Sequence, residues 1–424
     1  MDEKHTSPRL RDGIQITPFD TSALEPRFLV QLPEGGRFQV SARLSQLIRA
    51  LAGNRSPAVV CAELATAWGQ KVTTEDLQTI VDRYLRPYGL LIDAGAAGRA
   101  VASPGPLLVR RPLFSPRLLS PLTRIGQYLF TPPAVSLILL VSLGVRYASY
   151  LHAPSPAGNL AGSFWASAAF VLLSILCHEL GHVSACRHYG CAHGEIGIGV
   201  YAIFPVFYTD VSDTWRLSRR QRMVVDVAGI YFQMAFALVL YAFYLVAGWP
   251  SALAALKLTD GMMLVALNPI FRFDGYWLFS DLIGVPNLRR RAGDTIRFAV
   301  RRLIRRAAAR RPALLQLPAA EMALLIVYAF VSNALLLYFF GSLLFFYLPG
   351  AVAGYPHLLT RSWELLRTGI TRHDLTLAAS ALRQPFTTTL VLAMLALMIW
   401  RGRRLFTGSF VALKRWMGAR QTKA

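Results

Sequence analysis

The sequence predicts a mostly α-helical polytopic membrane protein with about six transmembrane helices, a short β-hairpin or re-entrant segment, and a small N-terminal α+β domain. Composition is the first basis for this prediction, because 54% of the 424 residues are hydrophobic and only 16% are charged. The second is a set of apolar stretches close to the roughly 20 residues that cross a bilayer. The third is the net charge of +22, which comes largely from arginines clustered beside those stretches.

The N-terminal part reads as a flexible segment, 1–19, followed by a small folded domain, 20–95. The opening residues are polar and are not followed by the apolar stretch of a cleavable signal peptide, so we expect a cytoplasmic N-terminus. Within the domain, alternating apolar residues predict two strands, and helical patterns predict three helices, the last with a capping sequence at Thr73. These elements are expected at 28–32, 37–40, 42–51, 56–68 and 73–91.

A linker and membrane-surface segment, 96–132, leads to a membrane domain, 133–400, whose core is 160–285; a basic tail, 401–424, follows. Apolar runs predict six spans, of which the last is the shortest. The predicted spans are 133–151, 162–186, 224–247, 261–283, 321–347 and 386–400.

The distribution of Lys and Arg predicts that both termini are cytoplasmic, in the inner (plasma) membrane. The connections 152–161, 248–260 and 348–385 contain none, one and four of these residues. By contrast, ten arginines lie between Arg289 and Arg311. The anionic cytoplasmic leaflet is the simplest partner for this charge, so we do not expect nucleic-acid binding.

Two further segments have patterns of their own. Residues 296–307 alternate apolar and arginine faces at helical spacing, which predicts an amphipathic helix on the membrane surface, or else a solvated basic helix. Residues 196–208 are β-branched and aromatic with interrupting Gly and Pro, which predicts a β-hairpin or re-entrant loop. Such a backbone persists at membrane depth only beside protein or a water-filled cavity.

A metal-binding pattern lies at the end of the second predicted span, where His178, Glu179 and His182 form His-Glu-x-x-His. On a helix the two imidazoles share one face and can bind one zinc ion, with the Glu beside a metal-bound water. Ionisable residues at membrane depth are costly and usually functional. The cysteines, in contrast, have no metal-ligand spacing and are expected to be structural thiols: Cys61, Cys177, Cys186 and Cys191.

Zinc needs a third protein ligand, and Asp274 in the fourth predicted span is the best candidate. An unpaired carboxylate is unfavourable there, and coordination would resolve it. An ion pair with Arg272 is the alternative. Pro269 and Gly275 predict a broken or kinked helix. Asn268 either contacts substrate or caps the broken helix.

Other polar residues near these motifs have weaker patterns. His188 and His193 are expected to be interfacial or supporting histidines, since the chain leaves the span there. Asp210 is expected in a turn at the membrane surface. Asp226, just inside the third span, supports either the site or the start of its helix, and the sequence does not choose between them.

Together, His-Glu-x-x-His near the end of one span and Asn-Pro followed by Asp-Gly two spans later resemble the site-2 protease family of zinc metalloproteases, peptidase family M50. The resemblance covers about 160–285. Within it, the segments 204–211 and 272–277 are similar in sequence to a bacterial branch of peptide zinc metalloproteases. It implies His178, His182 and Asp274 as zinc ligands and Glu179 as general base. Four residues separate Asn-Pro from Asp-Gly, a departure that weakens the assignment of Asn268.

The strands and three helices of 20–95 resemble a PqqD-like winged-helix domain. That resemblance implies a domain that binds the leader of a ribosomally made precursor peptide by adding it as a strand. The alternative is a winged helix that binds DNA or only packs on the membrane domain.

The function expected is a zinc metalloendopeptidase that matures a peptide, with an exporter or other maturation proteins as possible partners. One alternative is a non-catalytic membrane subunit of a peptide export or immunity system. Another is a site-2-type protease that cleaves a membrane-bound regulator. The intact set of His178, Glu179, His182 and Asp274 favours an enzyme.

Overall fold

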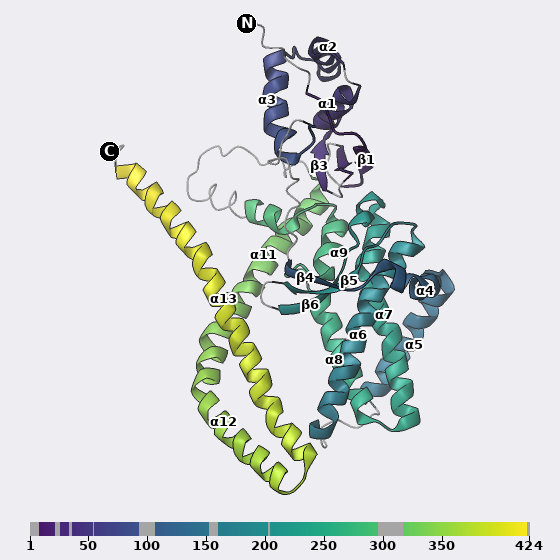
Figure 1. Ribbon diagram of the computed structural model, residues 1–424, viewed down its shortest axis with the longest axis vertical. Helices are drawn as coiled ribbons and strands as arrows, with labels where there is room; N and C mark the ends of the chain where they lie inside the picture. Colours follow the sequence, from purple (N-terminus) through teal and green to yellow (C-terminus); the bar gives the residue numbers. More distant parts are fainter. Residues whose placement is uncertain are drawn as a thin grey trace.

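A computed structural model shows a mostly helical protein, with two small sheets among the residues that it describes (Figure 1). A small domain built from β1–β3 and α1–α3 stands at one end of a helical body, and helices α12 and α13 form a hairpin beside that body. The structure describes residues 8–21, 26–33, 36–53, 55–92, 107–151, 160–201, 204–295 and 317–421. The helix predicted at 296–307 lies outside the described residues.

The N-terminal domain contains the predicted strands and helices, although the third helix ends at Tyr84 and does not continue to 91. One further strand, β1, lies within the segment 1–19, which was predicted to be flexible. An antiparallel sheet in the order β1–β2–β3 packs on three helices around an apolar core that includes Val30, Leu47, Val60 and Val81. The elements are β1 (Gln15–Phe19), β2 (Arg27–Gln31), β3 (Arg37–Ser41), α1 (Ala42–Ala52), α2 (Pro57–Trp68) and α3 (Thr74–Tyr84). Thr73 caps α3 in a reciprocal capping box with Asp76.

Four helical segments among the described residues are long and apolar enough to cross a membrane. They are α5 (Pro132–Leu151), α6 (Leu160–His188), α7 (Arg219–Ala247) and the run Ala319–Thr371. That run comprises α11 (Ala319–Ser342), a π-helical turn (Leu343–Tyr347) and α12 (Leu348–Thr371). The predicted connection 348–385 is therefore largely helical, and the sixth predicted span lies within α13 (Leu375–Gln421).

The prediction of a single helical span at 261–283 was wrong, because the structure has parts of two separate helices there. Helix α8 (Pro250–Ala266) already begins within the predicted outside connection 248–260, and α9 (Asp274–Ile283) is separate from it. Pro250 occupies the first turn of α8, where its missing N–H leaves no bond unmade. Asp260 of α8 forms an ion pair with Arg146 of α5, with Nη2 of Arg146 and Oδ1 of Asp260 2.7 Å apart.

The predicted β-hairpin is present as β5 (Ile196–Tyr201) and β6 (Phe204–Thr209), which pair antiparallel. A third strand, β4 (Leu107–Phe114), pairs with β5 and was not predicted, since it falls within the segment 96–132. Strand β6 is therefore at the edge of the three-stranded sheet. Its last residue, Thr209, reaches the helix that carries His178 and Glu179.

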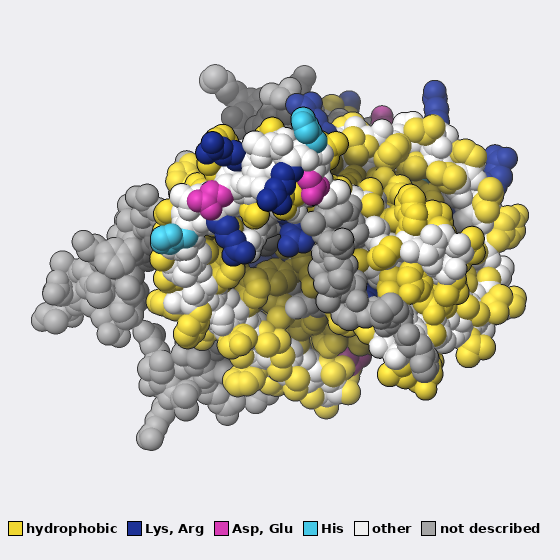
Figure 2. Space-filling view, turned by 90° about the horizontal axis from the view of Figure 1, so that it is seen from below, with side chains coloured by type: hydrophobic (Ala, Val, Ile, Leu, Met, Phe, Trp, Pro, Cys, Tyr) yellow, Lys and Arg dark blue, Asp and Glu magenta, His cyan; other side chains and the backbone are white. Residues whose placement is uncertain are grey.

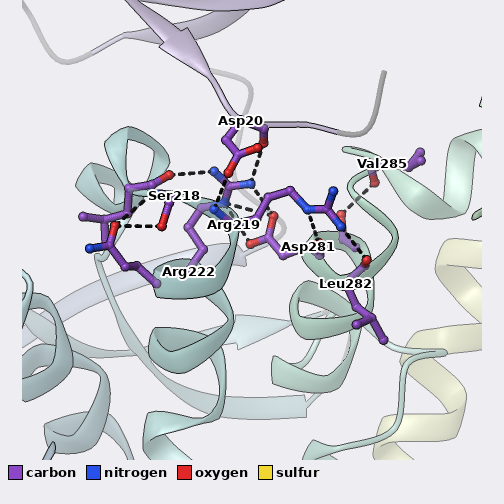
Figure 3. Close-up of polar contacts among 10 residues, drawn as sticks. Asp20, Ser218, Arg219, Arg222, Asp281, Leu282 and Val285 are labelled. Atoms are coloured by element: carbon purple, nitrogen blue, oxygen red, sulfur yellow. Dashed lines mark hydrogen bonds and ion pairs between the residues drawn. The ribbon is translucent and has the colours of Figure 1, made fainter. Parts of the chain in front are cut away.

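The N-terminal domain docks on the membrane domain through a polar cluster at the start of α7 (Figure 3). Arg222 binds both carboxylate oxygens of Asp281 on α9 at 2.8–2.9 Å and donates to the backbone oxygen of Asp20 at 2.9 Å. The backbone N–H of Arg219 donates to the Asp20 carboxylate. Next to this cluster, the ring of Phe19 stacks on Trp215.

Helix α4 (Pro116–Gly126) precedes α5, buries Leu119, Thr123 and Gly126, and leaves Leu118, Leu122 and Ile125 exposed. At the end of the molecule away from the N-terminal domain, hydrophobic side chains cover most of the surface, and charged ones gather on one part of it (Figure 2). Helices α5 and α11 also carry many large hydrophobic side chains that are exposed on the surface. Such surfaces are typical of a protein embedded in a bilayer.

Candidate metal centre

Three predicted ligands meet at one point, although they come from two helices nearly a hundred residues apart. His178 and His182 lie one turn apart on α6, and Asp274 is the first residue of α9. The two Nε2 atoms are 3.2 Å apart, and they lie 2.8 and 3.6 Å from the two carboxylate oxygens of Asp274. The ligand atoms of the three residues all lie within 4.8 Å of one another.

The outer nitrogens of both imidazoles already have partners. Nδ1 of His182 lies 2.8 Å from the backbone oxygen of Val225, and Nδ1 of His178 lies 3.0 Å from Oε1 of Gln233. Both partners are acceptors, so each Nδ1 carries the proton and each neutral ring presents a lone pair at Nε2. Two nitrogen lone pairs and a carboxylate thus converge in a site with little solvent exposure.

Three converging acceptors repel one another unless a cation lies between them. The Oδ2 atom of Asp274 is buried and has no hydrogen-bond partner of acceptable geometry among the described residues, although it lies 2.8 Å from Nε2 of His178. Two imidazole nitrogens and a carboxylate are ligands that zinc prefers, each at about 2 Å from the ion. The residues present therefore fit a zinc ion.

Two glycines make room for this arrangement. An added Cβ at Gly229 of α7 would lie 2.5–2.6 Å from ring atoms of His178, so only glycine leaves space for the imidazole. An added Cβ at Gly275 would collide with the backbone of Leu267 at the end of α8. Gly275 therefore allows α9 to begin directly against α8, which brings Asp274 to the histidines.

Glu179 is buried beside the two histidines, and its carboxylate is held from the sheet. The hydroxyl of Thr209, at the end of β6, donates to Oε2 of Glu179 at 2.6 Å. A charge-assisted bond of this length fixes the carboxylate relative to the strand. The glutamate of the motif and the edge strand therefore form one unit.

Asn268 and Arg272 lie in the interrupted segment between α8 and α9, and each side chain has a local contact there. Oδ1 of Asn268 accepts a hydrogen bond from the backbone N–H of Ile270 at 2.8 Å, a local turn contact, whereas the caps of α8 and α9 are Leu267 and Phe273. The guanidinium of Arg272 lies over the ring of Tyr276, whereas the Asp274 carboxylate faces the histidines. The hydroxyl of Tyr328 donates to the backbone oxygen of Pro269 and ties this segment to α11.

The remaining candidates are not among the three residues that could hold a metal ion. His188 packs against Phe130, and Nδ1 of His193 lies 3.1 Å from the backbone oxygen of Gly194. Asp210 accepts two hydrogen bonds from Ser212, which makes it a turn residue. Asp226 of α7 is half-buried, and its buried Oδ2 atom has no hydrogen-bond partner among the described residues.

Two residues at this site were missed by the sequence analysis: Gln233 and Thr209. Gln233 had a recognisable signal, since it is an amide within an otherwise apolar stretch of the third span. Thr209 had none, because only strand pairing and the hairpin direction bring its hydroxyl to α6.

Comparison with known proteins agrees with this geometry. A protein of Bacillus subtilis (strain 168) named "Putative peptide zinc metalloprotease protein YydH" is 25% identical over 123 residues, which are 28% of this chain and 49% of that protein. The chain thus matches about half the length of this relative. No solved structure shows a significant match.

The sequence profile of peptidase family M50 matches residues 166–412, which is more than half of the chain. The matched region includes His178, Glu179, His182 and Asp274. Membership of this family implies Zn²⁺ as the cofactor. This chain, a membrane protein by its apolar helices, therefore belongs to peptidase family M50.

Proposed function

We propose that this protein is a membrane-embedded zinc endopeptidase of the site-2 protease type, which cleaves a leader-bearing, ribosomally made peptide. The observation that carries the proposal is the convergence of three acceptors, with the two Nε2 atoms 3.2 Å apart and Asp274 facing them. His178, His182 and Asp274 would hold the zinc ion. When bound, zinc polarises the scissile carbonyl and acidifies a water molecule.

The chain's own residues supply the proton transfers. Glu179 accepts the proton of the attacking water at a carboxylate oxygen and returns it to the nitrogen of the departing amine. Thr209 holds that carboxylate in place through its 2.6 Å hydrogen bond. The amide nitrogen of Asn268 is a further candidate for contact with substrate, while its oxygen accepts the hydrogen bond from the backbone N–H of Ile270.

The edge of β6 is the proposed binding position for the peptide. In its sheet, β6 pairs with β5, and among the described strands no other one occupies its opposite edge. An extended peptide there would gain main-chain hydrogen bonds and lie beside Thr209 and Glu179. A short linear segment therefore suits the site better than a folded protein.

We propose that the N-terminal domain recruits the leader in the manner of a PqqD-like domain. Its strand β3 is an edge of the sheet β1–β2–β3, and Phe38 of β3 stacks on Tyr88, which remains 43% exposed. A main-chain edge beside exposed aromatic surface suits strand addition with side-chain selectivity. The six-span topology with both termini cytoplasmic would place this domain and the zinc ligands toward the same side of the membrane.

The test is cleavage of a library of fluorogenic peptides by the purified protein in detergent micelles. The wild-type protein should cleave some of them, and Glu179→Gln should lose about 10²–10⁴-fold in rate while keeping its zinc. Cleavage by Glu179→Gln at the wild-type rate would remove the protease assignment.

A further inference from the structure

The position of His178 depends on a buried polar chain that crosses three helices. Oε1 of Gln233 (α7) lies 3.0 Å from Nδ1 of His178 (α6). Nε2 of Gln233 donates to Oγ of Ser174 at 3.3 Å, and the hydroxyl of Thr259 (α8) donates to the same Oγ at 3.2 Å. All of these groups other than the imidazole are 0–2% exposed.

Burial of an amide at this position is unfavourable unless both of its ends are bonded. Polar groups inside a membrane domain have no water to replace a lost partner, so each unmade bond costs on the order of a few kcal/mol. The structure satisfies both ends of Gln233, one with Ser174 and the other with His178. The amide nitrogen is thereby committed to Ser174, which leaves only the oxygen for the imidazole.

We infer that Gln233 is a positioning residue for His178, with Ser174 and Thr259 fixing its amide; this inference rests on the proposed zinc site. An acceptor at Nδ1 holds the proton there, keeps the Nε2 lone pair free, and fixes the rotation of the ring toward Asp274. Gly229, one turn before Gln233 on the same helix, clears the space that the ring occupies.

The two histidines are held in different ways, which makes the inference specific. Nδ1 of His182 is held by the backbone oxygen of Val225, which is present whatever the side chain. Nδ1 of His178 is held by the side chain of Gln233, so a substitution at Gln233 removes this hydrogen bond and leaves the one to His182 in place. Changes at Gln233 should therefore act on zinc affinity through one ligand of the three.

The experiment measures zinc affinity of the full-length protein in micelles by competition with a chromophoric chelator, using zinc alone as the probe. Gln233→Leu, which removes the acceptor but keeps similar bulk, should weaken binding about 10–100-fold. Gln233→Glu keeps an oxygen for His178 and should restore most of the affinity. Ser174→Ala should weaken binding less than Gln233→Leu.

Ser142→Ala is the matched control, since Ser142 is a buried hydroxyl in α5 that donates to the backbone oxygen of Met234, next to Gln233. It should leave zinc affinity unchanged. Gln233→Leu within twofold of wild type would overturn the inference, as would a loss that Gln233→Glu does not restore. Absence of zinc from the wild-type protein would instead overturn the proposed zinc site itself.

Discussion

Thr209 donates a 2.6 Å hydrogen bond to the Glu179 carboxylate and thereby joins the end of strand β6 to the helix that carries both histidines. The edge strand proposed to bind peptide therefore ends at the proposed general base. The same contact explains why the hairpin β5–β6 lies against α6 rather than apart from it.

Substitution of Thr209 by Val should lower the rate of peptide cleavage about tenfold or more, because a hydrogen bond to a charged group contributes roughly 1.5–3 kcal/mol. The zinc content should not change, since Thr209 touches none of the three ligands. Thr209→Ser, which keeps the hydroxyl, is the control and should retain most of the activity. Equal rates for the Val and Ser variants would show that the hydroxyl has no role.

Gly229→Ala should weaken zinc binding on the order of tenfold, because overpacking typically costs about 1–3 kcal/mol and here falls on the ring of His178. Alanine otherwise favours helices, so the fold of α7 should persist. Gly144→Ala in α5 is the matched control, since no atom of the described residues lies within 4 Å of its added Cβ. The measurement is zinc affinity by chelator competition, and equal affinities for the two variants would contradict this account.

Removal of Arg222 should destabilise the protein by about 3–5 kcal/mol, because it leaves the Asp281 carboxylate without its main partner. Arg222→Leu should therefore lower the unfolding midpoint clearly. The double variant Arg222→Leu/Asp281→Leu should recover part of the loss, because no uncompensated charge remains. Arg86→Leu is the control, since the ion pair of Arg86 with Asp82 is on the surface, with both side chains 47% exposed. If the double variant lost as much free energy of unfolding as Arg222→Leu and Asp281→Leu together, the ion pair would not be the cause.

Asp76 gives the N-terminal domain a specific acid sensitivity. Its hydrogen bonds with Thr73 lower the pKa of its carboxyl below the ordinary value of 3.8. A lowered folded pKa means that this contribution to stability is complete above the unfolded value and is lost as pH falls through the folded one. Hydrogen exchange at the start of α3 should be faster in Asp76→Ala than in wild type at neutral pH. The difference should vanish in acid; a difference independent of pH would exclude the carboxylate.

The parts of the site that chemistry dictates were predictable from sequence. His178 and His182 share a helix face by their spacing, and a carboxylate in an apolar stretch, Asp274, needs a cation or a partner. The role of Gln233 was not predictable, because it depends on which helices are neighbours. Strand β4 was missed because its pairing with β5 is non-local. The hydroxyl of Thr209 was missed for the same reason, since its contact with Glu179 is also non-local.

The division of the fourth predicted span has a similar physical reason. Hydropathy alone does not distinguish a continuous helix from two helices with apolar residues between them. The start of α8 at Pro250 falls within the predicted connection 248–260, whose residue Asp260 pairs with Arg146 of α5. Residues 268–273, where the helix is interrupted, place Asp274 at the start of α9 and hence at the site.

We propose that His178, His182 and Asp274 hold the zinc ion of this M50 family member. This assignment is tested most directly by the zinc content of the purified protein, measured by elemental analysis beside the His178→Ala/His182→Ala variant. We expect about one zinc per wild-type chain and almost none in the double variant, with both proteins folded. Zinc retained undiminished by the double variant would contradict it.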